Sequence, residues 1–502
     1  MTPFKRAFLV LLPIIGCVIW YLLKVLQFQT SPEQYADGMV ILQLSRGWLE
    51  GRPFLFDTVY GHHAQQHNYY FIPLVGILTK PMGVYGLFTA YLGLVGFFFW
   101  KYDRSIAGFN AFERTTTWLT AFFFVFGPMG YFIYLDYFGW HPEHYLIPLL
   151  ALLSLSLAEK KRGLIILWLL LALSVKESSV VLLCCLLLFC SVVDMVLSNP
   201  ARHRSAYILN RRNLIITGVS LVVFLSGLWL LSYLNGSKAS RLGLALSRVE
   251  LGSTLLWYLV SSCLIGLLTF GLGMLPFIPW LRLSPHKKII VWTLAGGYAI
   301  LFVMFATEAL FYFPVIYPGV SYPARLGGLW AFMLSAFIFF SYRLTQSGTM
   351  PSQTAIPWIL TGGLLQFLLA PFLVAHYFTF EARPSVLSAN VSYMVKTRLG
   401  LDPYPEGIAR QLYMLARRMP YGSEVIVPFH YTRFFENIYP AYWEEDGRRP
   451  AHILGQPLLY MYEKDLVKNG HYHDFPGKDY TMVPNEHLLI LVESNWYQSN
   501  LK

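Results

Sequence analysis

Four ionisable side chains gather in one short stretch of an otherwise apolar sequence. Residues 136–144 contain two carboxylates, Asp136 and Glu143, and two imidazoles, His141 and His144. Apolar runs flank the stretch on both sides, which is typical of a short loop between two membrane helices. Because polar groups are costly at membrane depth, a cluster this dense indicates a functional site, with Asp136 as a second carboxylate or a histidine partner.

Two acidic residues follow the first apolar run. Glu33 and Asp37 are spaced i, i+4, which places both carboxylates on one face of a helix. A positioned carboxylate can act as a general base toward a hydroxyl group, or it can hold a divalent metal ion through its oxygen atoms. A solvated acidic pair that caps a helix explains the same spacing, so the residues alone leave these roles open.

Histidines recur farther along the same loop. His63 and His67 are again spaced i, i+4, a spacing that suits a metal-binding or phosphate-contacting face. Histidines in loops are also ordinary hydrogen-bonding groups. Metal ligation, substrate contact and plain hydrogen bonding therefore stay open for this pair, and the identity of any metal is undetermined.

Charged residues also stand at the ends of apolar runs. Lys176 and Glu177 separate two such runs, and Arg325 begins another. Lys176 is expected either to reach from the membrane boundary into water or to contact a lipid phosphate as a point charge. Arg325 lies on the side where basic residues are not expected, so we predict that it binds phosphate. Glu143 either caps the helix that follows it or positions a substrate.

The composition indicates a membrane protein with many spans. Of the 502 residues, 56% are hydrophobic and 13% are charged, whereas a soluble domain has roughly 25% charged residues. The net charge of +11 comes mostly from short loops, where Lys and Arg set topology, so we expect membrane lipids and no nucleic acid as partners.

The five cysteines lie in apolar runs, which favours buried side chains over disulfides or metal sites. No P-loop, HExxH or GxSxG motif is present, which disfavours ATP-driven transport.

The apolar runs and basic loops predict about 11 spans in the inner (plasma) membrane, with a cytoplasmic N-terminus and an extracytoplasmic C-terminal part. The first run, after Lys5 and Arg6, is expected to be an uncleaved helix. The expected spans are residues 7–28, 85–100, 117–135, a fourth ending before 159, 164–175, 180–197, 214–234, 255–281, 289–307, a tenth ending at 343, and 357–378. Residues 29–84 form a long outer loop that contains a short interfacial helix over 69–78, and 235–253 are expected to lie on the outer surface. With this orientation the polar clusters fall on the outer face.

The composition changes after residue 380. Residues 381–502 are polar and have no run long enough to span a membrane. Helical periodicity predicts a helix over 406–419, and short apolar runs predict strands over 424–429 and 488–493. The fold class is therefore mainly α: a polytopic transmembrane helical bundle over 1–380 with a small C-terminal α/β domain.

These motifs resemble a prokaryotic membrane protein family catalogued as domain of unknown function 2079, which is grouped with the GT-C-type glycosyltransferases. The resemblance covers most of the chain. It rests on Asp37-Gly38, His67 to Leu78, Phe138-Gly-Trp-His141-Pro-Glu143, Val175-Lys176-Glu177 and the stretch 417–427. It implies a GT-C-like membrane domain and an enzyme that transfers a sugar from a polyprenyl-phosphate donor to an acceptor on the outer face.

The resemblance also implies roles for single residues. The catalytic carboxylate maps to Asp37, although the loop lacks an Asp-x-Asp motif, so Glu33 and Asp57 are rivals. A divalent metal ion as cofactor stays open. The residues expected to bind substrate are Glu33, His63, His67, Asp136, His141, Glu143, Lys176, Glu177 and Arg325.

Two other functions fit the same sequence. A transporter or flippase for a lipid-linked or anionic solute would need charged residues within its spans and access from both faces. A non-catalytic membrane assembly protein would use its outer domain to bind a partner. The one-sided polarity favours the transferase.

Overall fold

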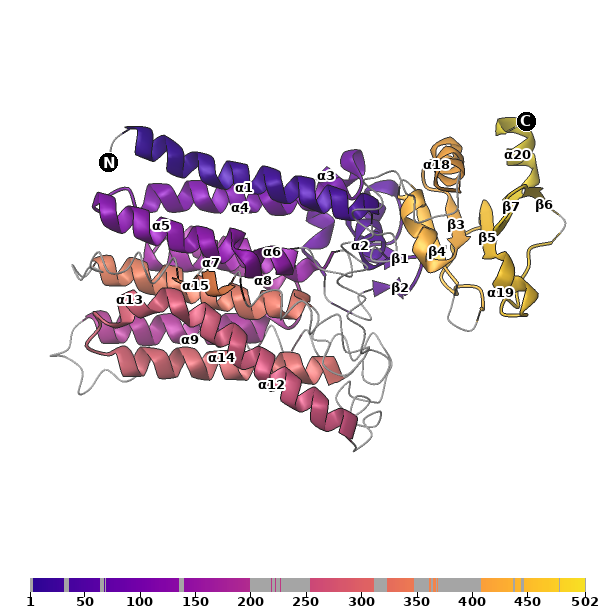
Figure 1. The fold of residues 1–502 in the computed structure, drawn as a ribbon. Helices are drawn as coiled ribbons and strands as arrows, with labels where there is room; N and C mark the ends of the chain where they lie inside the picture. Colours follow the sequence, from indigo (N-terminus) through magenta and orange to yellow (C-terminus); the bar gives the residue numbers. More distant parts are fainter. Residues whose placement is uncertain are drawn as a thin grey trace. The chain divides into compact units, whose positions relative to one another are not determined.

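The described chain is mainly helical with a small C-terminal sheet, as the sequence predicts (Figure 1). The structure is a computed structural model. It describes residues 3–30, 36–63, 67, 69–134, 140–198, 253–310, 323–346, 408–436, 438–443, 447–477 and 479–501, with isolated residues between 218 and 226 and between 361 and 368. The expected spans over 214–234 and 357–378 and the amphipathic segment over 235–253 lie almost wholly outside the described residues.

The chain divides into two units. The first unit contains Met1–Leu22, Tyr91–Asp136 and Pro142–Leu387, and the second contains Leu23–Ala90, Tyr137–His141 and Ser388–Lys502. Residues 29–84, here called the first loop, and the C-terminal residues therefore belong to one unit, although they are far apart in the sequence.

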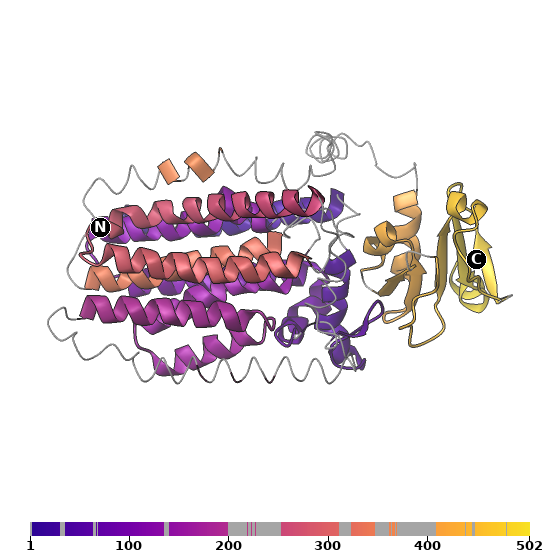
Figure 2. The ribbon, with the colours of Figure 1, turned by 90° about the horizontal axis from the view of Figure 1, so that it is seen from below.

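Helices that run along one another build the first unit (Figure 2). Its elements are α5 (Ala111–Phe126), α6 (Pro128–Tyr134), η4 (Pro142–Tyr145), α7 (Leu146–Ala158), α8 (Arg162–Leu173), α9 (Ser179–Ser198), α12 (Ser253–Met274), η6 (Leu275–Phe277), α13 (Ile278–Leu281), α14 (Lys287–Leu310) and α15 (Pro323–Gln346), with the first part of α1 (Pro3–Thr30) and α4 (Tyr85–Ser105) from Tyr91 onward.

Helices α7 and α15 form the centre of this unit. Every residue of α7 is buried, and α15 packs against α5, α7 and α9. Helix α14 instead exposes large apolar side chains, among them Trp292 and Val303. The exposed apolar side chains of α14 thus contrast with the packed apolar interior at α7.

Three helices of the described residues are long and apolar enough to cross a membrane: Ser179–Leu197, Lys287–Ala306 and Leu326–Gln346. Shorter apolar helices cover Leu9–Val25, Ile72–Met82, Pro142–Ala158, Arg162–Leu173 and Gly266–Leu281. This number is smaller than the sequence predicts, and the count of about 11 stays a prediction.

Within the described residues, two features explain why fewer long apolar helices occur than the sequence predicts. The segment expected to span over 117–135 is not one continuous helix, because Gly127 adopts an extended backbone between α5 and α6 and Pro128 begins the second helix. The fourth and fifth expected spans are also short: α7 has 13 residues and α8 has 12. At 1.5 Å per residue such helices reach roughly 20 Å, less than the apolar thickness of a bilayer.

The first-loop part of the second unit contains two packed helices and a small hairpin. These elements are α2 (Ala36–Arg46), η2 (Gly47–Glu50), β1 (Phe56–Asp57), β2 (Gly61–His62) and α3 (Ile72–Met82). Helix α3 corresponds to the expected interfacial helix, and it exposes Leu74 and Ile77. Its other face approaches α2 closely, since a Cβ atom on Gly76 would lie 2.1 Å from the carbonyl oxygen of Ser45.

The C-terminal part of the second unit is an α/β domain, which confirms the expected small sheet. Its elements are α18 (Ile408–Arg418), β3 (Glu424–Val427), η7 (Phe429–Phe435), β4 (Tyr439–Tyr442), β5 (Leu459–Glu463), α19 (Lys464–Lys468), β6 (Tyr480–Val483), β7 (Leu488–Glu493) and α20 (Ser494–Asn500). The strand order is β4-β3-β5-β7-β6. Strand β3 is parallel to β4 and β5, whereas β7 is antiparallel to β5 and β6.

Alternating side chains give this sheet two covered faces. Leu459 and Met461 of β5 face a core that includes α18 and η7. Tyr460 and Tyr462 of the same strand face an aromatic cluster with Trp443. The period of two residues along a strand produces this division.

Candidate functional site

The expected catalytic residue lies at the start of a buried helix. Asp37 occupies the first turn of α2, and its side chain lies outside the described residues, as does the whole of Glu33. From Gly38 to Arg46 every residue of α2 is buried. Asp37 is therefore followed directly by a buried helical segment.

A second carboxylate in the same loop is paired with a histidine. Asp57 ends β1, and its Oδ1 accepts hydrogen bonds from the backbone N–H groups of Val59 (2.8 Å) and Tyr60 (2.7 Å). Its Oδ2 lies 2.9 Å from Nδ1 of His63, and both side chains are buried. Three contacts thus occupy the Asp57 carboxylate, which makes it an orienting group rather than an open base.

The contact with Asp57 orients the His63 ring. In the tautomer whose Nδ1–H donates to the carboxylate, Nε2 can accept a hydrogen bond or bind a ligand. Nε2 of His63 is buried and has no hydrogen-bond partner. The adjacent His62 points to the other side of its strand and is exposed.

The spacing of His63 and His67 brings the two rings together as predicted. The backbone N–H of His67 donates to the carbonyl oxygen of His63 at 2.9 Å, and the ring centroids lie 6.0 Å apart. Tyr69 stacks on both rings. Among the described residues no group of three metal-binding side chains occurs, and metal ligation by this pair stays a prediction.

A buried ion pair joins two expected site residues of the first unit. Nζ of Lys176 lies 2.6 Å from Oε1 of Glu143, and the two side chains are 8% and 5% exposed. The expectation that Lys176 reaches into water is wrong, because its charge is buried against a carboxylate. Glu143 lies in η4, the short helix before α7. Next to it, Nε2 of His144 contacts the carbonyl oxygen of Ile133 at 2.8 Å.

The remaining expected site residues are only partly described. Arg325 lies in the first turn of α15 with its side chain outside the described residues, and Asp136 lies wholly outside them. His141 and Glu177 are half-buried. The structure thus brings Glu143 to Lys176 and His63 to His67; a common pocket for all of these residues stays a prediction.

Sequence reasoning missed a buried lysine in the first helix. Lys24 is fully buried in α1, and its ammonium group lies 5.9 Å from the ring centroid of Phe88 and 5.8 Å from that of Trp140. Such distances are typical of cation–π contacts. A lysine inside an apolar run was the signal that could have found it.

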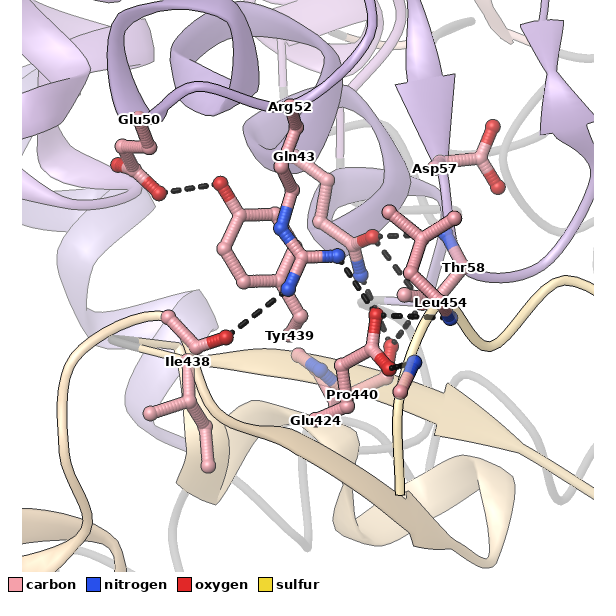
Figure 3. Close-up of polar contacts among 12 residues, drawn as sticks. Gln43, Glu50, Arg52, Asp57, Thr58, Glu424, Ile438, Tyr439, Pro440 and Leu454 are labelled. Carbon is pink, nitrogen blue, oxygen red and sulfur yellow. Dashed lines mark hydrogen bonds and ion pairs between the residues drawn. The ribbon is translucent and has the colours of Figure 1, made fainter. Parts of the chain in front are cut away.

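Sequence reasoning also missed a polar layer between the first loop and the C-terminal sheet. Arg52 pairs with Glu424 at 2.7 Å and lies 3.4 Å from the ring centroid of Tyr439. Glu50 accepts a hydrogen bond from the hydroxyl group of Tyr439 (Figure 3). Arg46 donates to the carbonyl oxygen of Ile438 at 2.9 Å. These contacts hold η2 and the end of α2 against β3 and β4.

Glu436 borders this layer and makes the second unit sensitive to pH. Its Oε2 is enclosed and has no hydrogen-bond partner. Burial raises the pKa of Glu436 to about 7, and the charge of Arg46 opposes the rise. Because the pKa of Glu436 is higher in the folded chain than in the unfolded chain, the stabilising contribution of its protonated carboxyl group is fully present at low pH. This contribution is lost as the pH rises through 7.

Glu436→Gln should therefore stabilise the chain at pH 8 by up to about 3 kcal/mol and should have no effect near pH 4. The amide stays neutral at both values, so the variant loses the pH dependence that the carboxyl group causes. Thermal unfolding of the purified chain between pH 4 and 8.5 measures the difference. Glu486→Gln, at a side chain that is 89% exposed, is the control and should change nothing. Parallel pH curves for Glu436→Gln and the unaltered chain would contradict the prediction.

In comparisons with known proteins, no family model and no curated protein matches this chain.

Proposed function

We propose that this protein is a membrane glycosyltransferase that moves a sugar from a polyprenyl-phosphate-linked donor to an acceptor on the outer face of the membrane. The observation that carries the proposal is a buried carboxylate–imidazole pair in the first loop, where Oδ2 of Asp57 lies 2.9 Å from Nδ1 of His63. Loops between apolar helices seldom bury such groups without a functional reason.

The reaction needs a proton acceptor and a site for the leaving phosphate. In the proposed step Asp37 takes the proton of the acceptor hydroxyl group, and the oxygen forms a bond to the anomeric carbon of the donor. The bond from that carbon to the phosphate oxygen breaks, and polyprenyl phosphate leaves with the electron pair. Lys176 and Arg325 stabilise the charge on the leaving phosphate.

Other residues complete the proposed site. Glu33, His63, His67, Asp136, His141, Glu143 and Glu177 position donor or acceptor. With Nδ1–H of His63 donating to Asp57, Nε2 can accept a hydrogen bond from a sugar hydroxyl group. A divalent metal ion bound to the loop carboxylates is an additional part of the proposal.

The finer architecture belongs to the same proposal. It comprises a GT-C-like bundle of about 11 spans over residues 1–380 in the inner membrane, with a cytoplasmic N-terminus and an extracytoplasmic domain over 381–502. The apolar outer surface of α14 and the exposed apolar face of α3 support placement in and at a bilayer.

The test supplies the purified chain in lipid nanodiscs with a panel of polyprenyl-phosphate-linked hexoses, pentoses and N-acetylhexosamines. Release of polyprenyl phosphate is measured by mass spectrometry, with and without a chelator. Release from one donor class above a heat-treated sample is the expected result, and sensitivity to the chelator would assign the metal. No release from any donor would contradict the proposal.

One observation favours a transporter as the second candidate. Glu143 and Lys176 form a buried ion pair within the apolar helical unit, and charges at such positions mark solute or ion pathways in membrane proteins. Uptake of a lipid-linked or anionic solute into proteoliposomes, without release of polyprenyl phosphate, would support this function instead.

A further inference from the structure

Gln43 lies in the middle of α2, six residues after Asp37. Its side chain is almost completely buried. A buried amide needs partners for both its N–H groups and its oxygen, so its partners reveal what the helix is fastened to.

The partners come from two segments that are distant in the sequence. Nε2 of Gln43 donates to the carbonyl oxygen of Pro440 at 2.8 Å. Its Oε1 accepts from the backbone N–H of Thr58 at 2.9 Å. The hydroxyl group of Thr58 lies 3.0 Å from the Gln43 oxygen and 2.9 Å from the Pro440 oxygen. Figure 3 shows the Gln43 amide between these two residues.

Each of these segments belongs to a different part of the proposed site. Helix α2 carries Asp37, and Thr58 directly follows Asp57, which holds His63. Pro440 is in β4, the edge strand of the C-terminal sheet. One amide therefore connects the expected base, the turn that orients the histidine, and the sheet.

From this juxtaposition we propose that Gln43 is a positioning residue that fastens the acid–base groups of the first loop to the C-terminal sheet. The sheet is then an integral part of the active unit and not an appended binding module. The inference rests on the proposed transferase function for its kinetic consequences, but the contacts themselves do not depend on it.

Neighbouring contacts brace the same segments. Arg52 pairs with Glu424 of β3, and Arg46 donates to the Ile438 carbonyl oxygen just before β4. Because these bonds do not involve Gln43, we expect a substitution there to shift the loop locally without unfolding the unit.

The substitution Gln43→Glu gives a sharp test. A protonated carboxyl group has the shape of the amide: its O–H can donate to the Pro440 oxygen while its C=O accepts from Thr58. An ionised carboxylate instead faces the Pro440 carbonyl oxygen and cannot donate. The variant should therefore keep the native contacts at low pH and lose them at high pH.

The expected result is kinetic and pH-dependent. At pH 8 we expect kcat of Gln43→Glu to fall by about 100-fold, since small displacements of reacting groups have effects of this size. KM for the donor should stay within twofold. As the pH is lowered to 5.5, the ratio of variant to wild-type kcat should rise at least tenfold.

Gln411→Glu is the matched control. Gln411 also donates to a proline carbonyl oxygen, that of Pro484 at 2.9 Å, and accepts from Asn485 at 2.6 Å. It lies in α18, and its contact with Pro484 is exposed. The same substitution there should leave kcat, KM and their pH dependence unchanged.

Hydrogen exchange separates this inference from the proposed function. At pH 8, amides of residues 36–46 and 56–63 should exchange faster in Gln43→Glu than in the wild type. Amides of β5 and β7 should not change, which shows that the sheet remains folded. Unchanged exchange in both first-loop segments would overturn the inference even if the chain transfers sugar. If the wild type releases no polyprenyl phosphate, the transferase proposal fails, while faster exchange in the first loop still supports the role of Gln43.

A loss of kcat in Gln43→Glu that is equal at pH 5.5 and pH 8 would also overturn the inference about Gln43.

Discussion

Asp37→Asn is expected to abolish sugar transfer while the chain remains folded and inserted in the membrane. The amide has the size of the carboxylate but cannot take the proton of an acceptor hydroxyl group. General-base catalysis contributes about 10²- to 10⁴-fold to such reactions. We therefore expect kcat for release of polyprenyl phosphate to fall by at least about 100-fold, with little change in KM.

The control for this variant is Asp465→Asn. Asp465 belongs to the same unit, and its side chain is 93% exposed in α19. It should retain full activity. If Asp37→Asn turned over the donor at the wild-type rate, the assignment of Asp37 as the base would be wrong.

Asp57 is the described rival, and its environment predicts a different outcome. Two backbone N–H groups and His63 occupy its carboxylate. Asp57→Asn would weaken these contacts and remove the carboxylate that orients the His63 ring. It should therefore lower stability as well as activity. Loss of activity with unchanged unfolding temperature is thus the signature of Asp37 and not of Asp57.

The helices were predictable where the apolar periodicity is long and uninterrupted. Helix α9 lies within a few residues of the expected span over 180–197, and α14 lies close to the expected span over 289–307. The strand β7 was predictable for a similar reason, since Leu488, Ile490 and Val492 alternate with side chains of the other face. In each case local pattern and tertiary packing favour the same structure.

The break between α5 and α6 was not predictable from hydropathy. Gly127 lies in a uniformly apolar run. In its extended conformation the backbone of Gly127 lies so close to Phe123 that a Cβ atom would be 2.2 Å from the Phe123 carbonyl oxygen, so only glycine fits there. The Gly-Pro pair was the only local signal.

The site was predictable in its residue types but not in its partners. The spacing of His63 and His67 indicated that the rings are neighbours, and they are. In contrast, Gln43, Thr58 and Pro440 are ordinary polar or turn residues in the sequence, and contacts across nearly 400 positions bring them together. Hydrogen bonds between distant segments leave no periodic pattern, which is why the link between first loop and sheet was missed.

Lys176→Met is expected to have the largest effect on stability. It removes the cation from a pair whose side chains are 8% and 5% exposed. The carboxylate of Glu143 then remains buried without that charge, and removal of one partner of a buried pair typically costs about 3–5 kcal/mol. We expect a loss of this size in unfolding experiments in detergent, together with loss of sugar transfer.

The double variant Lys176→Met/Glu143→Leu should recover most of the stability, because two apolar side chains of similar volume avoid burying a charge. It should not recover transfer if Lys176 binds the donor phosphate.

The matched control is Lys161→Met. Lys161 pairs with Glu159 at 3.0 Å but is 48% exposed, and exposed pairs contribute about 0–1 kcal/mol. Equal losses for Lys161→Met and Lys176→Met, or a double variant no more stable than Lys176→Met alone, would contradict the prediction. Recovery of stability without recovery of transfer would separate the energetic role of this pair from its role toward the phosphate.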